Sequence, residues 1–316
     1  MIKYLSSLLL LLVGGCSSIK DISVTYILQL EKYKSSREKV ISSLTKSDRN
    51  IIVIDYSFDG CESGKLKPEE LNKIRSGKDN RKILSYLSIG EAEDYRFYWN
   101  KKWKKNKAEF LMPENPKWEG NFKVKYWNDE WQKIILTYLD EIIEQGFDGI
   151  FLDIVDGYGY FEEGKNGEYI DNKINPETNN SYRKDMILWV EKLATYAKLK
   201  NKKFIIIPQN APELLTNKNY LNIIDGIALE DLFSNNNKKQ NKYHTNLVLK
   251  NLEFVKKEKK LFWTVEYAKS AKMLEFLKKK QEEHKIPMLI TNRNLTKNGE
   301  FIQVEKYSEP TFLDTL

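Results

Sequence analysis

Carboxylate side chains follow most of the short apolar stretches of this sequence, and grouped carboxylates can do chemistry. The clearest case is residues 146–158, GFDGIFLDIVDGY, where an apolar run ends on Asp153 and Asp156 follows three residues later. Comparable positions elsewhere are held by Asp55, Asp59, Glu91, Glu93, Asp94, Glu230, Asp231 and Glu266. Basic residues are scarce at these points, with Arg96 and Arg293 as the exceptions.

Such a set permits three kinds of function. Two carboxyl groups can cleave a glycosidic bond as nucleophile and acid/base, several can bind a divalent metal through oxygen, and a group of them can hold a cationic ligand without catalysis. Any single acid could instead cap a helix or form a turn, where Asp is favoured. That explanation does not fit the whole set well, because the opposite ends of the apolar runs lack the pattern.

The apolar runs that these acids follow are predicted to be buried parallel strands. They are short, nearly continuous and rich in Ile, Val and Leu, which is typical of strands covered on both faces. The eight runs are residues 24–30, 51–56, 82–89, 149–154, 204–209, 226–230, 261–266 and 287–291. Helical patterns fill several gaps between them, at residues 67–77, 129–146, 181–200, 245–257 and 271–283.

Eight strands alternating with helices predict an α/β fold, a single (β/α)8 TIM barrel with long loops after strands 3 and 4. Those loops are residues 92–130 and 156–181. An open doubly wound sheet is the alternative, but neither GxGxxG nor GxxxxGK[ST] follows a strand. In a barrel, the carboxyl ends of the strands form one mouth, so the acids would gather there.

Aromatic residues are concentrated in the first long loop. Trp99, Trp103, Trp118 and Trp127 all lie there, and Tyr158 and Tyr160 follow Asp156. Aromatic faces pack against the C–H faces of sugar rings while carboxylates and amides bind hydroxyl groups. The same rings could instead anchor the loop to the barrel, and both interpretations stay open.

Composition narrows the classes of partner. The 316-residue chain has a formal net charge of +7 spread over many Lys, without a basic block interleaved with aromatics, so nucleic-acid binding is not expected. The only two His, His244 and His284, cannot form a conventional zinc site by themselves. We predict no cofactor and no metal.

The first residues predict export and a lipid anchor. Lys3, a short apolar run and the sequence VGGC resemble a bacterial lipobox, which would make 1–15 a signal peptide and Cys16 the lipidated residue. Residues 16–23 would then be a short tether and 24–316 the barrel, held at the membrane of the bacterial cell envelope. A plain signal peptide or an uncleaved anchor is the alternative. Cys61 would remain as a single thiol, which cannot form an internal disulfide.

Six motifs in order resemble one known family. They are YLSIGEAEDYRFYW, NPKWEGNFKVKYWNDEW, GFDGIFLDIVDGY, PQNAPELL, GIALEDLF and VEYA, and the resemblance runs from about residue 24 to 295. Together they are similar to the barrels of glycoside hydrolase family 114, the relatives of endo-α-1,4-polygalactosaminidase. Each motif is weak alone, but six in sequence, each at its expected strand, are specific.

The resemblance implies a retaining glycosidase that acts on α-1,4-linked galactosamine or N-acetylgalactosamine polymers. Asp153 matches the nucleophile of the family and Glu230 matches the acid/base. The residues expected to contact the polysaccharide are Asp55, Glu91, Tyr95, Arg96, Asp156, Tyr158, Asn210, Glu266 and Tyr267. Independently of the family, an acidic mouth favours a cationic amino-sugar polymer over an anionic one.

Two other functions stay open at this point. The chain could be a lipid-anchored polysaccharide-binding protein with an inactive barrel site, which would bind without turnover. It could also be a metal-dependent hydrolase, which a chelator would inhibit.

Overall fold

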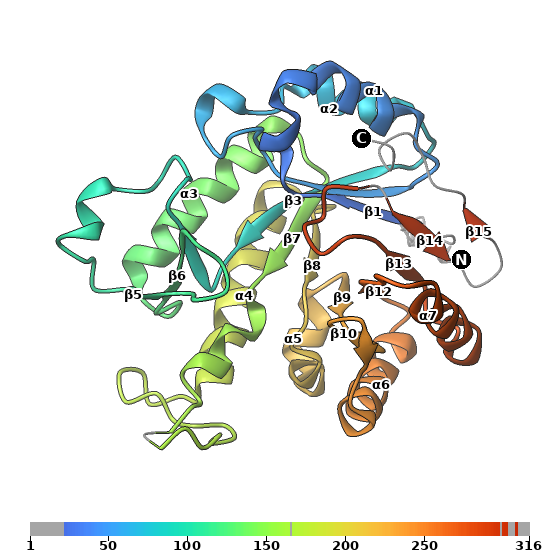
Figure 1. Ribbon diagram of the computed structural model, residues 1–316. Helices are drawn as coiled ribbons and strands as arrows, with labels where there is room; N and C mark the ends of the chain where they lie inside the picture. The colour runs from blue at the N-terminus through green and yellow to red at the C-terminus, as the bar shows by residue number, and fades with distance from the viewer. Residues whose placement is uncertain (1–21, 165, 298, 303–306, 309–316) are drawn as a thin grey trace, which may run out of the picture.

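The barrel strands follow one another around the molecule in chain order. The computed structural model describes residues 22–164, 166–297, 299–302 and 307–308 (Figure 1). Its eight barrel strands are β1 (Val24–Ile27), β2 (Ile51–Ile54), β3 (Lys82–Ser88), β7 (Gly149–Asp153), β8 (Ile205–Pro208), β9 (Gly226–Glu230), β12 (Leu261–Glu266) and β13 (Met288–Ile290). All eight predicted strands are present, each within a few residues of its expected bounds.

Parallel pairing joins these strands into two halves. One half has the order β1-β2-β3-β7-β8, and the other runs β9-β12-β13 and continues into antiparallel β14 (Glu300–Ile302) and β15 (Tyr307–Ser308). The halves meet where Gln209 bridges Ala228, and on the opposite side the Leu28 N–H donates to the Leu295 carbonyl at 2.9 Å. A doubly wound sheet would reverse its strand order, whereas this order does not reverse, so the TIM-barrel prediction is confirmed.

Alternation along each strand separates two cores. The interior of the barrel is filled by one set of buried side chains: Val24, Tyr26, Ile51, Val53, Leu84, Tyr86, Phe151, Ile207, Ala228, Trp263, Val265, Tyr267 and Leu289. Their neighbours in sequence point outward and pack beneath the helices, as Ile150 and Leu152 of β7 do. Because side chains alternate between faces, Asp153 shares the inner face with Phe151.

The helices cover the outside of the barrel. They are α1 (Arg37–Lys46), α2 (Pro68–Ser76), α3 (Asp129–Gln145), α4 (Tyr182–Lys200), α5 (Lys218–Ile223), α6 (Lys242–Lys257) and α7 (Ala271–His284), and shorter 3-10 turns are η1 (Leu30–Ser36), η2 (Glu62–Gly64) and η5 (Pro212–Thr216). In α3, the Asn128 side chain accepts hydrogen bonds from the first free N–H groups and Gly146, with φ of 89°, ends the helix. Helices α1 and α5 were not predicted.

The loop after β3 forms a small sheet of its own. Strands β4 (Glu91–Glu93), β5 (Leu111–Glu114) and β6 (Asn121–Val124) pair antiparallel in the order β4-β6-β5, and η3 (Lys101–Lys104) lies between β4 and β5. This sheet lies beside α3 (Figure 1), where Trp131 packs against Phe110 and Tyr98 at ring-centroid distances of 5.5 and 5.8 Å. Several aromatic residues of the loop therefore anchor it.

The loop after β7 begins with η4 (Val155–Tyr160) and is tied to α4. Asp185, near the start of α4, accepts hydrogen bonds from Asn175, Thr178 and Asn180 at 2.7 to 2.9 Å. A buried acid thus holds the end of this loop against the helix that follows it.

Cys16, the predicted signal peptide and most of the predicted tether lie outside the described residues. Within the part of the chain that the structure describes, no helix combines the length and the apolar character that crossing a membrane requires.

Candidate active site

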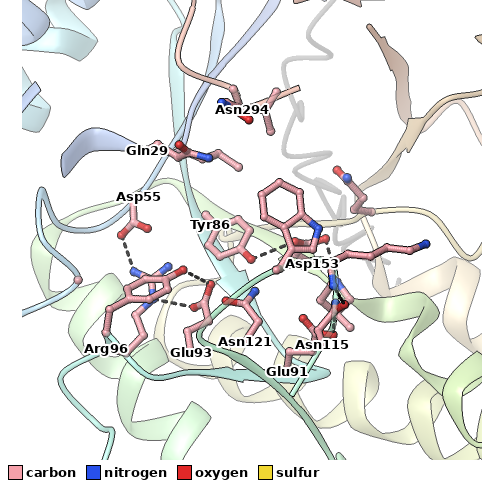
Figure 2. Close-up of a pocket in the computed structure, with 18 of the residues that line it drawn as sticks. Gln29, Asp55, Tyr86, Glu91, Glu93, Arg96, Asn115, Asn121, Asp153 and Asn294 are labelled. Carbon is pink, nitrogen blue, oxygen red and sulfur yellow. Dashed lines mark hydrogen bonds and ion pairs between the residues drawn. The ribbon is translucent and has the colours of Figure 1, made fainter. Parts of the chain in front are cut away.

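One cavity opens at the carboxyl ends of the barrel strands. It has a volume of about 870 Å³. The predicted site residues that line it are Asp55, Glu91, Tyr95, Arg96, Asp153, Asp156, Asn210 and Glu230 (Figure 2 shows part of this set). Residues in or directly after the first five barrel strands, in β9 and in the small sheet thus meet at one place, as the barrel predicts.

Asp153 is the last residue of β7 and points into this cavity. Its carboxylate accepts hydrogen bonds from the Tyr86 hydroxyl at 3.0 Å and from the Ile154 N–H at 2.9 Å (Figure 2 shows the first). Both donors favour the ionised form of the carboxyl group. The side chain is therefore held in a fixed direction by two neighbours.

The chain turns sharply directly after Asp153. Ile154 has φ of 57°, which is an outlier for a β-branched residue. A Cβ atom on Gly90 would lie 2.4 Å from the Ile154 carbonyl oxygen, so only glycine fits opposite this turn. Strained backbone of this kind is concentrated at functional sites. Here it turns the chain directly after Asp153.

Glu230 ends β9 on the same inner face. It accepts a hydrogen bond from the Tyr267 hydroxyl, and its N–H donates to the Asn210 side chain at 3.0 Å. Asn210 and Asp231, with φ of 60° and 55°, also lie in the left-handed region. Asn210 further donates to Asp156 at 3.4 Å, which connects Asp156 to the backbone of Glu230.

The environment of Asp153 and Glu230 disfavours ionisation of both carboxyl groups at once. Burial raises the pKa of the Asp153 carboxyl to about 8, and repulsion from Glu230 adds to the shift. Burial also raises the pKa of Glu230, against the opposing effects of the Tyr267 hydrogen bond and the Arg293 charge. Because the two groups repel each other, they titrate as a pair and can share one proton.

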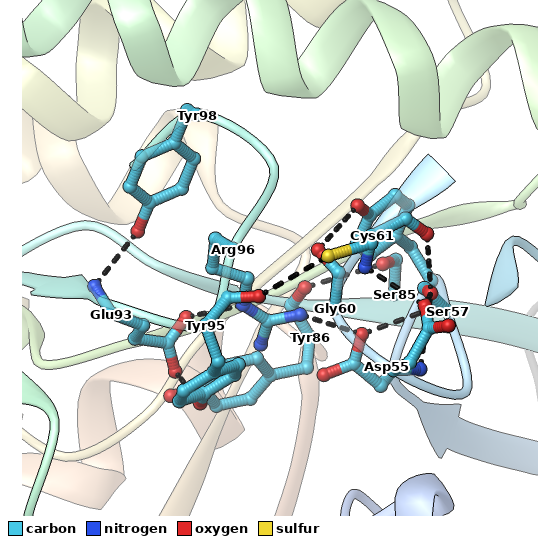
Figure 3. Close-up of polar contacts among 12 residues, drawn as sticks. Asp55, Ser57, Gly60, Cys61, Ser85, Tyr86, Glu93, Tyr95, Arg96 and Tyr98 are labelled. Carbon is cyan, nitrogen blue, oxygen red and sulfur yellow. Dashed lines mark hydrogen bonds and ion pairs between the residues drawn. The ribbon is translucent and has the colours of Figure 1, made fainter. Parts of the chain in front are cut away.

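A buried arginine joins two further acids of the cavity. Arg96 donates to Asp55 and to Glu93, each at 2.7 Å, and Tyr95 donates to Glu93 at 2.6 Å (Figure 3). Burial opposes the charge of Arg96, but Asp55 and Glu93 raise its pKa well above the usual range. This cluster fixes one wall of the cavity, and Tyr95 keeps 46% of its side chain exposed there.

Glu91, two residues from Glu93 on β4, forms a neighbouring part of the wall. It accepts hydrogen bonds from Asn115 and from the Tyr160 hydroxyl, both at 2.9 Å. The ammonium group of Lys123, which pairs with Glu91 across β4 and β6, lies 4.2 Å from the centre of the Tyr160 ring. The small sheet therefore supplies both an acid and a base to the cavity.

Three predicted substrate contacts lie outside the cavity. Glu266 faces outward because the register pairs Val265 with Glu230, which places the following residue on the other face. Its buried carboxylate instead accepts three hydrogen bonds from Phe233 and Ser234, and so holds the turn after β9. The prediction that Glu266 contacts substrate is therefore wrong for this structure.

Tyr158 and Tyr267 were also predicted to contact substrate, but neither lines the cavity. Tyr158 is 2% exposed and donates its hydroxyl to Glu213, away from the cavity. Tyr267 is 3% exposed and lies behind Glu230, to which it donates. Tyr267 therefore positions a predicted catalytic residue and does not meet the cavity directly.

Tyr86 and Gln209 also line the cavity, although neither was predicted as a site residue. Each lies two residues beyond an inward-facing residue of its strand, Leu84 or Ile207. Counting faces along the predicted strands would have found both, since polar side chains at inward positions near a carboxyl end point to the mouth.

The cavity is acidic although the chain is basic. Nine acids line it, against four basic residues: Glu31, Asp55, Asp59, Glu91, Glu93, Glu119, Asp153, Asp156 and Glu230, against Arg96, Lys117, Lys123 and Arg293. Among the described residues, no group of three or more His, Cys, Asp or Glu side chains is arranged to hold a metal ion.

The fold and the site define a TIM barrel with paired carboxylates at the mouth, the architecture of many sugar-cleaving enzymes. Residues 32–309 match the profile of "Glycoside-hydrolase family GH114". The chain belongs to this family, and the resemblance found in its sequence is confirmed.

Solved structures share the fold. The chain superposes on the glycoside hydrolase domain of PelA from Pseudomonas aeruginosa with a TM-score of 0.63 and 12% identity, covering 88% of this chain and 97% of that one. For the complex of Aspergillus fumigatus Ega3 with galactosamine, the TM-score is 0.57 and the identity 18%, over 87% and 91% of the two chains.

A closer relative in sequence is an uncharacterized protein of Methanocaldococcus jannaschii. It is 42% identical over 231 residues, which cover 72% of this chain and 63% of that protein. The match therefore spans less than two thirds of the length of the relative.

Proposed function

We propose that this chain is a retaining glycoside hydrolase with Asp153 as nucleophile and Glu230 as acid/base. The observation that carries the proposal is the convergence of these two carboxyl groups, from the ends of β7 and β9, in one acidic cavity where burial raises the pKa of each. Carboxyl groups with strongly shifted pKa values in a cleft are typical of catalytic acids and bases. Membership of GH114 supports the same reaction.

The reaction would proceed in two displacements. Asp153 attacks the anomeric carbon while Glu230 gives its proton to the departing glycosidic oxygen, which forms a covalent glycosyl–aspartate and releases the first product. Glu230, now ionised, takes a proton from water as that water attacks the same carbon. The bond to Asp153 breaks, and its carboxylate is restored with Glu230 protonated again.

The hydrogen bonds around the pair favour this division of roles. Asp153 accepts from the Ile154 N–H, a donor that cannot rotate away, and from Tyr86. A single proton shared by the pair would then reside on Glu230, whose carboxylate faces side-chain donors, those of Tyr267 and Gln209, which can rotate away. A nucleophile that is ionised beside an acid that is protonated is the starting state the reaction needs.

The proposed substrate is an α-1,4-linked polymer of galactosamine or N-acetylgalactosamine. Three observations support it: the motifs shared with polygalactosaminidase relatives, the galactosamine bound to the structurally similar Ega3, and the excess of acids over bases in the cavity. Ammonium groups of de-N-acetylated units would be attracted to these acids. The aromatic side chains of Tyr95 and Trp118, 46% and 45% exposed, offer faces for sugar rings.

The decisive test replaces each carboxyl group by its amide. We expect Asp153→Asn and Glu230→Gln each to lower kcat on polygalactosaminides by about 10²–10⁴-fold, the usual contribution of a positioned acid or base. Release of new reducing ends measures the rate. Asp79→Asn, an exposed acid outside the cavity, is the matched control and should retain full activity.

Activity retained in either amide variant would refute the role assigned to that residue. Binding of the polymer by the wild-type chain without any turnover would instead identify a polysaccharide-binding protein with an inactive site. Loss of activity on adding a chelator would favour the metal-dependent alternative.

We also propose that the chain is exported and anchored by a lipid on Cys16. The support is the sequence alone: Lys3, the apolar run and the VGGC motif. Metabolic labelling with a fatty-acid analogue should mark the wild-type chain and fail to mark Cys16→Ser. Equal labelling of both chains would contradict the proposal.

A further inference from the structure

A second cavity lies on the other face of the small sheet formed by β4, β5 and β6. It has a volume of about 590 Å³, within the range of small-molecule sites. Its lining includes Trp99, Trp103, Phe122, Asp94, Lys104 and Glu119. The mechanism proposed above uses none of these residues.

Strand alternation places the two cavities back to back. Asn121 and Lys123 of β6 line the main cavity, whereas Phe122 between them lines the second one. Glu119, in the turn between β5 and β6, lines both. The edge of the sheet is therefore a continuous path from one cavity to the other around this turn.

The wall of the second cavity is aromatic. Trp99 lies against Phe122, with ring centroids 4.9 Å apart, and meets Trp103 edge to face at 5.2 Å. All three side chains are partly exposed. Partly exposed, mutually supported rings present fixed apolar faces of the kind that pack against sugar rings.

The polar groups of the second cavity differ in availability. Asp94 is paired with Lys104 at 2.9 Å, and Glu114 accepts the Gly120 N–H at 2.6 Å. In the described part of the chain, no hydrogen bond or ion pair engages the carboxylate of Glu119, which is exposed. An unengaged carboxylate beside aromatic faces suits a sugar that carries an ammonium group.

We propose that the second cavity is a remote binding site for the polymer, holding a hexosamine segment that continues around the Glu119 turn from the segment in the main cavity. The ligand class rests on the proposed function. The two segments would be linked covalently, so the second site would raise affinity for long chains through effective concentration and leave the affinity for short ones unchanged.

The test uses the full chain with Glu230→Gln, to prevent cleavage, and galactosamine oligomers of two lengths, one too short to leave the main cavity. Trp103→Ala should weaken binding of the long oligomer about tenfold, the effect of one strong contact, and should not alter binding of the short one. Trp103→Phe, which keeps a ring, should bind both nearly as the parent does. Trp118→Ala, in the main cavity alone, should weaken both.

Hydroxyl-radical footprinting of the Glu230→Gln chain gives a second measurement that needs no change in the second cavity. The long oligomer should protect Trp99 and Trp103, and the short one should leave them reactive. Long-oligomer binding that Trp103→Ala leaves unchanged, or a long oligomer that leaves both Trp residues reactive, would overturn the second site. Cleavage by the wild-type chain is scored separately: protection without cleavage would refute the proposed reaction and not the second site.

Discussion

Asp153 combines two conflicting properties: it is buried, which disfavours a charge, and it must ionise to act as a nucleophile. Its pKa is raised to about 8 by burial and by Glu230, although the Ile154 N–H and the Tyr86 hydroxyl favour its charge. The folded chain therefore holds on the coupled pair of Asp153 and Glu230 a proton that the unfolded chain loses near pH 4. The residue serves the proposed reaction at the expense of stability.

This conflict predicts how stability depends on pH. Between about pH 4 and about pH 8 the folded state binds the extra proton, so the free energy of unfolding falls as pH rises through that window. Asp153→Asn removes one carboxyl group of the pair, and with it the repulsion that helps to retain the shared proton. We expect its Tm to fall less with pH than that of the wild type, and to exceed the wild-type Tm at pH 8 by on the order of 2–4 °C.

Thermal unfolding followed by circular dichroism at several pH values gives the comparison. Asp79→Asn is again the control, because an exposed acid should leave the wild-type slope in place. A parallel pH dependence for Asp153→Asn and the wild type would show that the pair of Asp153 and Glu230 does not hold the extra proton.

The position of Asp153 depends on one close contact between two turns. Gly90, between β3 and β4, lies against the backbone of Ile154, which is in a strained conformation after β7. The two turns hold each other, and Asp153 leaves β7 at that point. The direction of the carboxylate therefore depends on a glycine 63 residues away in sequence.

Gly90→Ala tests that dependence. Its Cβ atom would lie 2.4 Å from the Ile154 carbonyl oxygen, so the backbone must shift, at a cost of about 1–3 kcal/mol in unfolding free energy. We expect a lower Tm and a lower kcat. Gly159→Ala is the matched control, since nothing lies within 4 Å of the added atom; equal behaviour of the two variants would contradict the contact.

The helices and strands differ in how well the sequence predicts them. The eight strands were visible because their apolar runs are continuous, and α3 because its apolar periodicity and its ends agree. The six-residue α5 is too short to show a pattern. The sheet of the first insertion depends on pairing of β4 with β6, such as Glu91 with Lys123, and such distant pairing leaves little trace in sequence.

Within the site, the ends of the strands were predictable and the faces were less so. Asp153 and Glu230 were placed correctly in one cavity because both end predicted strands. Glu266 was misplaced because it too ends a strand, β12, while the register with β9 turns it outward. A single step in strand register reverses the face of a side chain, and position along the chain alone does not fix it.

At the scale of the whole molecule, charge is distributed unevenly. The chain has a formal net charge of +7, yet acids outnumber bases in the main cavity. Clefts lined by one sign of charge focus the electrostatic potential and concentrate ligands of the opposite sign. The basic remainder of the surface would not draw a cationic polymer, so attraction should be strongest at the mouth.

The charge distribution predicts a salt effect that depends on acetylation. We expect kcat/KM for de-N-acetylated polymer to fall about tenfold from low to physiological ionic strength, because salt screens the attraction. Fully N-acetylated polymer carries no ammonium groups and serves as the control, with little change expected. Equal rates on both polymers and no salt effect would contradict a cationic substrate.

The central claim is that Asp153 and Glu230 cleave a galactosaminide by double displacement, and the configuration of the first product tests it most directly. Proton NMR can follow the new reducing end as the wild-type chain cleaves a galactosamine oligomer. Two inversions at one carbon restore the starting configuration, so the α anomer should appear first and the β anomer only later through mutarotation. A product that appears first as the β anomer, or no new reducing end at all, would contradict the account.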